Sequence, residues 1–191
     1  MNRPKFALLA LALGLGLLIT LRSAVGASNG KALGHIVRFD LVQIVQGTVL
    51  ACGTDMATDA ASGDVINLTG SGEFKPGPGD AAGGGTFVQT SGTTEIAHGV
   101  WLVTGFISWQ PAGGTLPPVA DGIGQASEAS SGIVTLAVRL FPLGGSPHDG
   151  VLTVDCHLPG ATFPVEEGVT LTVGPLHFTQ SGGNTLFHIL G

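Results

Sequence analysis

Apolar and polar residues alternate with a period of two along most of the chain, which is typical of half-buried β-strands. In the segment 65–74, Ile66, Leu68 and Phe74 share one parity, and polar residues occupy the other. Beyond residue 27 we find no convincing 3.6-residue apolar period. We therefore predict an all-β fold, an antiparallel β-barrel or sandwich of roughly nine or ten strands. The remaining expected strands are 35–44, 48–52, 83–89, 96–109, 132–141, 151–156, 168–173, 176–180 and 185–189.

Two segments depart from this simple alternation. The segment 96–109 carries apolar residues on both parities, which predicts a central strand covered on both faces. The segment Pro111 to Ser131 contains Pro117-Pro118, several glycines and few large apolar residues. Ordering such a segment costs conformational entropy that little apolar burial offsets. We therefore expect a mobile, solvent-exposed flap at one end of the β-structure. The segment 53–63 is expected to be a polar loop.

The first 27 residues have the pattern of a signal peptide. Arg3 and Lys5 precede an apolar run over 6–21, and small residues end at Ala27. A helix of that run spans about 24 Å, short of the roughly 30 Å hydrocarbon core. We expect cleavage after Ala27, with an uncleaved membrane anchor as the alternative. The domain prediction is a signal peptide at 1–27, a flexible tail at 28–34 and a single β-domain at 35–191, secreted or periplasmic and without stable membrane insertion after cleavage.

The charge of the expected mature chain excludes one class of partner. Four basic residues remain there against thirteen acidic ones, a formal charge of −9. Nucleic-acid binding requires clustered Lys and Arg that replace counterions on phosphates. Nucleic acid is therefore excluded as a partner, and an anionic membrane surface is disfavoured for the same reason.

The only two cysteines, Cys52 and Cys156, both lie in the expected mature chain. Disulfides persist in exported proteins, so we expect one bridge between these two residues. The alternative is a reactive thiol at Cys156, next to His157. Adjacent strand residues point to opposite faces, which weakens that alternative.

Five short motifs resemble a group of secreted bacterial proteins of unknown function. They are Gly70-Ser71-Gly72-Glu73-Phe74, Gly83-Gly84-Gly85-Thr86-Phe87, His98-Gly99-Val100-Trp101, the segment 150–156 and the segment 181–187. The resemblance implies no activity and no catalytic residue. A fainter resemblance, carried by the glycine-rich segment 83–87, links the chain to the dirigent and allene oxide cyclase barrels.

The histidines provide candidate metal ligands. Asp155 and His157 share a parity, and His177 and His188 lie on later expected strands that are able to pair near them. Such a cluster has the ligand types that zinc or copper takes. The alternative is that these histidines are separate surface or core residues.

Other chemistry-bearing residues have simpler alternatives. Asp55, Asp59 and Asp64 suggest a calcium loop, but their spacing matches no standard ligand loop. Trp101 and Trp109 suggest a stacking surface for a ligand, and their spacing also fits core packing. We find no nucleophile elbow, dinucleotide fingerprint or phosphate loop, and no motif implies a cofactor.

Three functional hypotheses follow. The first is a non-enzymatic binding or structural module, because no catalytic constellation stands out. The second is a carrier of a small hydrophobic ligand inside a β-barrel. The third is a barrel-type isomerase or cyclase with Glu73 or Asp155 as general acid or base, which requires a carboxyl with a raised pKa in a pocket.

Overall fold

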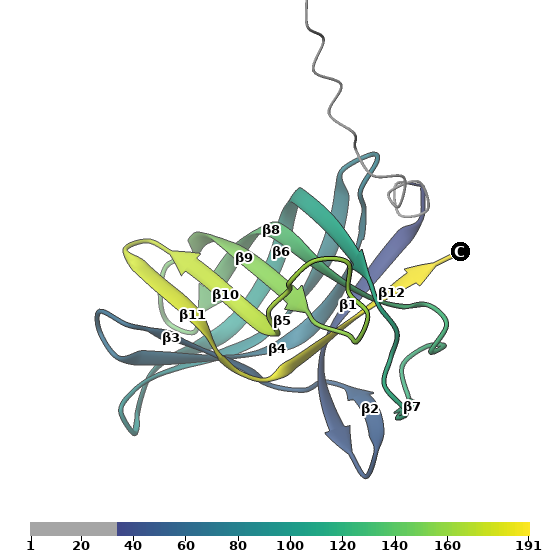
Figure 1. Ribbon diagram of the computed structural model, residues 1–191. Helices are drawn as coiled ribbons and strands as arrows, with labels where there is room; N and C mark the ends of the chain where they lie inside the picture. Colours follow the sequence, from purple (N-terminus) through teal and green to yellow (C-terminus); the bar gives the residue numbers. More distant parts are fainter. Residues whose placement is uncertain (1–33) are drawn as a thin grey trace, which may run out of the picture.

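The computed structural model describes residues 34–191, so the expected signal peptide and all but the last residue of the expected tail lie outside the described residues. The described chain is all-β, as predicted, and contains twelve strands and no helix (Figure 1). Over that range we find no helix with the length and apolarity needed to cross a membrane. The strands are β1 (Ile36–Val45), β2 (Thr48–Ala51), β3 (Asp55–Asp59), β4 (Asp64–Lys75), β5 (Asp80–Ser91), β6 (Thr94–Gly113), β7 (Ala120–Asp121), β8 (Ala129–Pro142), β9 (His148–Cys156), β10 (Gly168–Val173), β11 (Leu176–Gly182) and β12 (Asn184–Leu190).

Eight of the strands pair in a closed ring. The order β3-β4-β5-β6-β8-β9-β10-β11 returns to β3 because β11 pairs with β3, and each of these pairings is antiparallel. Strands β1 and β12 form a further antiparallel pair, which attaches to the last residues of β4 and the first residues of β8. Strand β2 forms a hairpin with β1 and pairs in parallel with β7 (Figure 1). The sheet is therefore mixed.

Side chains fill the interior of the ring. Along β8, Val134, Leu136 and Val138 are buried, and the residues between them are more exposed, as the alternation predicts. An aromatic cluster lies where β1 and β12 meet the ring: Trp109 contacts Phe74 and Phe187 at ring-centroid distances of 5.1 and 4.8 Å. The interior is thus a packed core.

Strand β6 differs from its prediction. Ile96, Val100, Leu102 and Ile107 are each about half exposed, so one face of this strand is not covered. Register shifts after Val103 and Phe106 change which parity faces the core. A register change of one residue turns the side chains to the other face. Trp101 and Trp109 consequently both point inward, although Ile107 between them points out.

Glycines allow close backbone contact between β4, β5 and β6. Gly70 and Gly85 are opposite each other, and Gly85 is also opposite Trp101. A Cβ on Gly85 would lie 1.8 Å from the carbonyl oxygen of Thr69. The glycine-rich motifs therefore serve sheet geometry at this point.

Strand β3 was expected to be loop. Its sequence, Asp55-Met-Ala-Thr-Asp59, has no apolar alternation, yet it pairs with both β4 and β11 and completes the ring. The segment becomes a strand because it pairs with β4 on one side and with the distant β11 on the other, and this pairing overrides its weak local strand propensity.

The expected flap at Pro111 to Ser131 is shorter than predicted. Strand β6 continues to Gly113 and β8 begins at Ala129, so only the segment 114–128 is irregular, apart from β7. Backbone hydrogen bonds join this segment to the β1–β2 hairpin, from Ala120 to Gly47 and from Gly122 to Val49. The segment is thus tied to the β1–β2 hairpin, although many of its residues are exposed to solvent.

Candidate functional site

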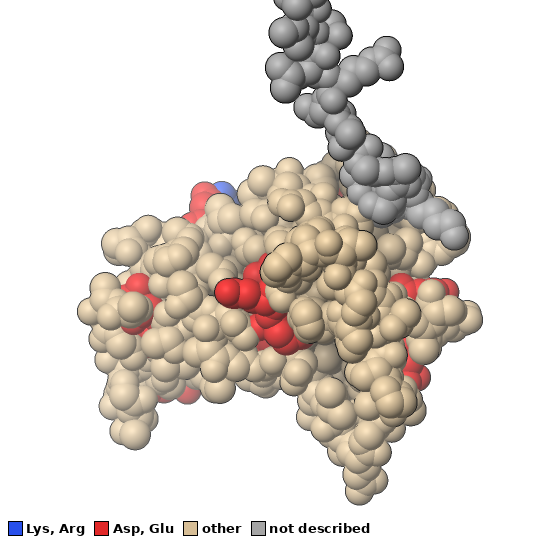
Figure 2. Space-filling model, viewed as in Figure 1, with Lys and Arg blue, Asp and Glu red and all other residues tan. Residues whose placement is uncertain are grey.

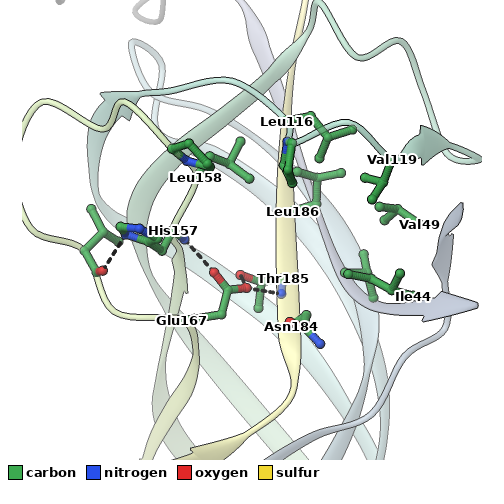
Figure 3. Close-up of a pocket in the computed structure, with 14 residues that line it drawn as sticks. Ile44, Val49, Leu116, Val119, His157, Leu158, Glu167, Asn184, Thr185 and Leu186 are labelled. Carbon is green, nitrogen blue, oxygen red and sulfur yellow. Dashed lines mark hydrogen bonds between the residues drawn. The ribbon is translucent and has the colours of Figure 1, made fainter. Parts of the chain in front are cut away.

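A pocket of about 460 Å³ lies at the end of the ring where β9 stops and β12 starts (Figure 3). Four parts of the chain surround it: the β1–β2 hairpin, the segment 114–128, the β9–β10 connection over 157–167, and the start of β12. Most of its lining is aliphatic. The lining residues are Val42, Ile44, Val49, Leu116, Pro117, Val119, His157, Leu158, Pro159, Val165, Glu167, Asn184, Thr185 and Leu186.

The pleat of β1 and β12 explains the aliphatic surface. Leu186 is opposite Asp40, and Asn184 is opposite Val42, so Val42, Ile44 and Leu186 share the face that turns away from the aromatic core. The other face of the pair carries Phe39 and Phe187 into that core. Because β1 is apolar on both parities here, it serves the core and the pocket together.

The β9–β10 connection is held in place by hydrogen bonds to the end of β6 and the start of β8. The backbone of Leu158 donates to the Ser131 hydroxyl at 2.6 Å, and Thr162 donates to the Ala112 carbonyl at 2.7 Å. The amide of Thr115 in turn donates to the Pro159 carbonyl at 2.9 Å, which joins two sides of the pocket. The pocket is therefore formed by fixed backbone and is preorganised.

Glu167 is the one carboxyl among the lining residues. Its Oε2 accepts the backbone N–H of His157 at 2.6 Å, and its Oε1 accepts the backbone N–H of Thr185 at 2.5 Å (Figure 3). Burial raises the pKa of Glu167 above its ordinary value, although these hydrogen bonds oppose the rise. The carboxyl thus links the end of β9 to the start of β12 and faces the polar side of the pocket.

Two further carboxyls lie close enough to Glu167 to respond to its charge. Burial, offset in part by the Asn184 N–H and supported by the charge of Glu167, raises the pKa of Asp55 to about 7. Burial and the charges of Glu166 and Glu167 raise the pKa of Asp155 to about 6. This end of the molecule is therefore a concentrated, partly desolvated acidic region.

A buried hydrogen bond between His188 and Asp121 joins the segment 114–128 to β12. His188 Nε2 lies 2.9 Å from Asp121 Oδ2, and the two side chains are 1% and 4% exposed. Burial pushes the pKa of Asp121 up, but hydrogen bonds from His188 and from the Gly124 and Ile123 amides outweigh it, so the pKa is lowered. The same segment carries Leu116 and Val119, which line the pocket.

The structure does not bring the expected metal ligands together. Asp155 and His157 lie at the end of β9, with His157 Nδ1 bonded to the Val165 carbonyl. His177 lies on β11 and forms a hydrogen bond with Thr172, and His188 forms one with Asp121. Over residues 34–191 we find no group of three or more His, Cys, Asp or Glu side chains arranged to hold a metal.

The other expected site residues are also dispersed. Trp101 is buried and donates from Nε1 to the Thr69 carbonyl at 3.0 Å, and Trp109 belongs to the aromatic cluster, so neither forms a stacking surface. Glu73 is exposed on β4, outside this pocket. Of the expected calcium loop, Asp59 accepts the Ser62 and His177 amides, and Asp64 accepts Gln89 Nε2. Asp55 is buried beside Asn184.

The expected disulfide is absent. Cys52 and Cys156 are both free, Cys52 exposed after β2 and Cys156 fully buried on β9. Burial strongly raises the pKa of the Cys156 thiol.

Sequence patterns did not predict the pocket itself. Glu167, Ile44 and Val49 were not among the expected site residues, because the pocket depends on four segments far apart in sequence. One signal was available: the Glu166-Glu167 pair directly precedes a strand in an otherwise apolar region. Searches for family models, curated proteins and solved structures found no match to the chain. The resemblance to secreted bacterial proteins therefore stays a prediction.

Proposed function

We propose that this protein is a non-enzymatic binding module whose ligand is a small hydrophobic molecule held in the pocket beside β12. The proposal is based on the aliphatic lining of the 460 Å³ pocket. That volume is within the range of ligand sites, about 300–1,000 Å³, and such sites combine apolar surface with a few polar groups.

The position of the pocket modifies the carrier hypothesis. We regard the eight-stranded ring as a small barrel, in which side chains such as Trp101, Phe178 and Leu136 occupy the interior. An eight-stranded barrel has an interior just wide enough for side chains to fill. The ligand we propose therefore binds at the end of the barrel, under the segment 114–128, and not along its axis.

The arrangement of the carboxyl groups near the pocket favours a role in binding over a role in catalysis. Glu167 is engaged by two backbone amides, and Asp155 is not among the lining residues, although its pKa is raised to about 6. A general acid or base has to reach a substrate proton at hydrogen-bond distance.

A matched pair of variants tests the proposal. Ile44 on the pocket and Ile107 on the outer face of β6 are 52% and 51% exposed. The probe is 1-decanol, followed by its displacement of a fluorescent apolar dye from the protein. Ile44→Asp places a charge on the apolar surface and is expected to weaken decanol binding about tenfold or more. Ile107→Asp is expected to bind decanol as the parent does.

Two results would contradict this function. One is failure of the parent protein to bind decanol or the dye. The other is an equal loss of binding in both variants, which would place the apolar compound on the outer surface and not in the pocket.

A further inference from the structure

We propose that the pocket selects an amphipathic molecule with a cationic amine head, its ammonium group beside Glu167 and its apolar body on the aliphatic surface. This inference rests on the proposed function and specifies the ligand's chemical class. Figure 3 shows the two halves: His157 and Glu167 lie on one side, and Ile44, Val49 and Val119 lie on the opposite side.

The polar side of the pocket offers hydrogen-bond acceptors. Glu167 Oε1 accepts the Thr185 amide and, at 3.2 Å, the Thr185 hydroxyl, and Oε2 accepts the His157 amide, which leaves about one of the roughly four acceptor positions of a carboxylate for a ligand. His157 Nδ1 lies 3.1 Å from the Val165 carbonyl, which only accepts, so Nδ1 carries the proton. The Nε2 of a neutral His157 is then an acceptor as well. A ligand head that donates hydrogen bonds matches both groups.

The charge around this side favours a cation. Asp155 and Glu166 adjoin Glu167 in the acidic region, and Asp55 lies within the reach of its charge. Neither Lys nor Arg is among the lining residues. Figure 2 shows that acidic side chains outnumber basic ones on the viewed face of the molecule.

The basic residues of the described chain are committed elsewhere. Arg38 pairs with Asp40 at 2.8 Å, Arg139 pairs with Asp149 at 2.6 Å, and Lys75 lies at the far end of β4 in a different pocket. A carboxylate head, as in a fatty acid, would therefore meet Glu167 with no Lys or Arg to compensate. Unlike charges in a partly desolvated site attract more strongly than in water, and like charges repel more strongly.

Three ligands of equal chain length separate head group from apolar body. Decylamine, 1-decanol and decanoate are titrated below their micelle concentrations at pH 7.5, at which the amine is cationic and the acid anionic. We expect decylamine to bind about tenfold more tightly than decanol, the difference of a charge-assisted hydrogen bond, and decanoate to bind more weakly than decanol.

The variants Glu167→Gln and Glu166→Gln assign the preference to one carboxyl. Both remove one negative charge from adjacent positions, but only Glu167 lines the pocket. Glu167→Gln is expected to reduce the amine-over-alcohol preference, measured as the ratio of the two affinities in the same variant, to below about threefold. Glu166→Gln is expected to keep most of the preference. Should Glu167→Gln fail to fold, the parent protein provides the second measurement: added salt is expected to weaken decylamine binding and leave decanol binding unchanged.

The outcomes separate this inference from the proposed function. If decanol binds in the pocket but decylamine binds no more tightly, or decanoate binds equally well, the cation preference is wrong and the apolar pocket function stands. The same conclusion follows if decylamine binding does not respond to salt. If none of the three ligands binds, both are wrong.

Discussion

Asp55 shows how burial changes the chemistry of a single acidic residue in this protein. Asp55 is fully buried, and its Oδ1 accepts the Asn184 amide at 3.0 Å while its Oδ2 has no partner. A buried carboxyl without a cation favours the neutral form, which is why its pKa rises. The sequence shows an acidic residue in a polar stretch and gives no sign of this environment.

Asp55→Asn is expected to stabilise the protein at high pH. The pKa of Asp55 is raised to about 7 in the folded protein, above its value near 3.8 in the unfolded chain. The neutral carboxyl therefore stabilises the fold below about pH 4, and this contribution is lost as the pH rises through 7. A tenfold change in proton affinity between the folded and unfolded chains corresponds to about 1.4 kcal/mol, so the variant should gain on the order of a few kcal/mol at pH 8 and roughly a third of that at pH 5.

Thermal unfolding of parent and variant from pH 4 to 9 measures this effect. The parent Tm is expected to fall as the pH rises from 5 to 8, and the Asp55→Asn curve to fall less. Asp80→Asn, a change at the exposed first residue of β5, is the control and should run parallel to the parent. If the Tm of the Asp55→Asn variant differs from that of the parent by the same amount at pH 5 and at pH 8, Asp55 does not titrate as described.

The cysteines give a second measurement at the scale of residues. With thiol reagent under native, unreduced conditions, the exposed Cys52 is expected to react and the buried Cys156 to stay unreacted. Unfolding without reductant should then expose two thiols per chain. Finding none in the unfolded, unreduced protein would establish the disulfide that the sequence predicted and the structure lacks.

At the scale of elements, sequence patterns located strands with strong alternation and failed where tertiary pairing decides. Strand β8 was predicted well because its apolar residues alternate without interruption. Strand β3 was missed because its residues become a strand only between β4 and β11. In β6, strict period-two alternation places Ile107 on the face of Trp101 and Trp109, but two register shifts, which have no clear sequence signal, turn it to the other face.

The segment 114–128 has the composition of a free loop but is held by buried polar contacts. Asp121 accepts from His188 and from the amides of Ile123 and Gly124. Asp121→Ala removes these contacts and leaves His188 buried without its partner, which costs about 1–3 kcal/mol. We expect the segment 114–128 to lose its protection from hydrogen exchange while the ring strands keep theirs.

Hydrogen–deuterium exchange followed by mass spectrometry compares the parent, Asp121→Ala and Asp149→Ala. Asp149 belongs to an exposed pair with Arg139, and exposed pairs contribute about 0–1 kcal/mol, so this control should behave as the parent does. If peptides covering 114–128 exchange completely at the earliest time in the parent, the segment is the mobile flap of the sequence prediction.

At the scale of the whole molecule, composition and alternation predicted an all-β fold, and the closure of the ring was beyond their reach. Closure depends on the pairing of β3 with β11, whose registered residues are more than 110 positions apart. The pocket arises in the same way, since residues from 42 to 186 line it. Local sequence patterns do not show which distant segments meet in space, although they did identify many of the apolar residues in those segments.

The central claim for the whole molecule is that a small apolar ligand occupies the pocket beside β12. The most direct measurement is a set of nuclear Overhauser contacts between decanol and the methyl groups of the isotope-labelled protein. We predict contacts to Val49, Leu158 and Leu186, which line the pocket. Contacts confined to Val100, Leu102 and Val151, which are exposed on β6 and β9, or no contacts at saturating decanol, would contradict this claim.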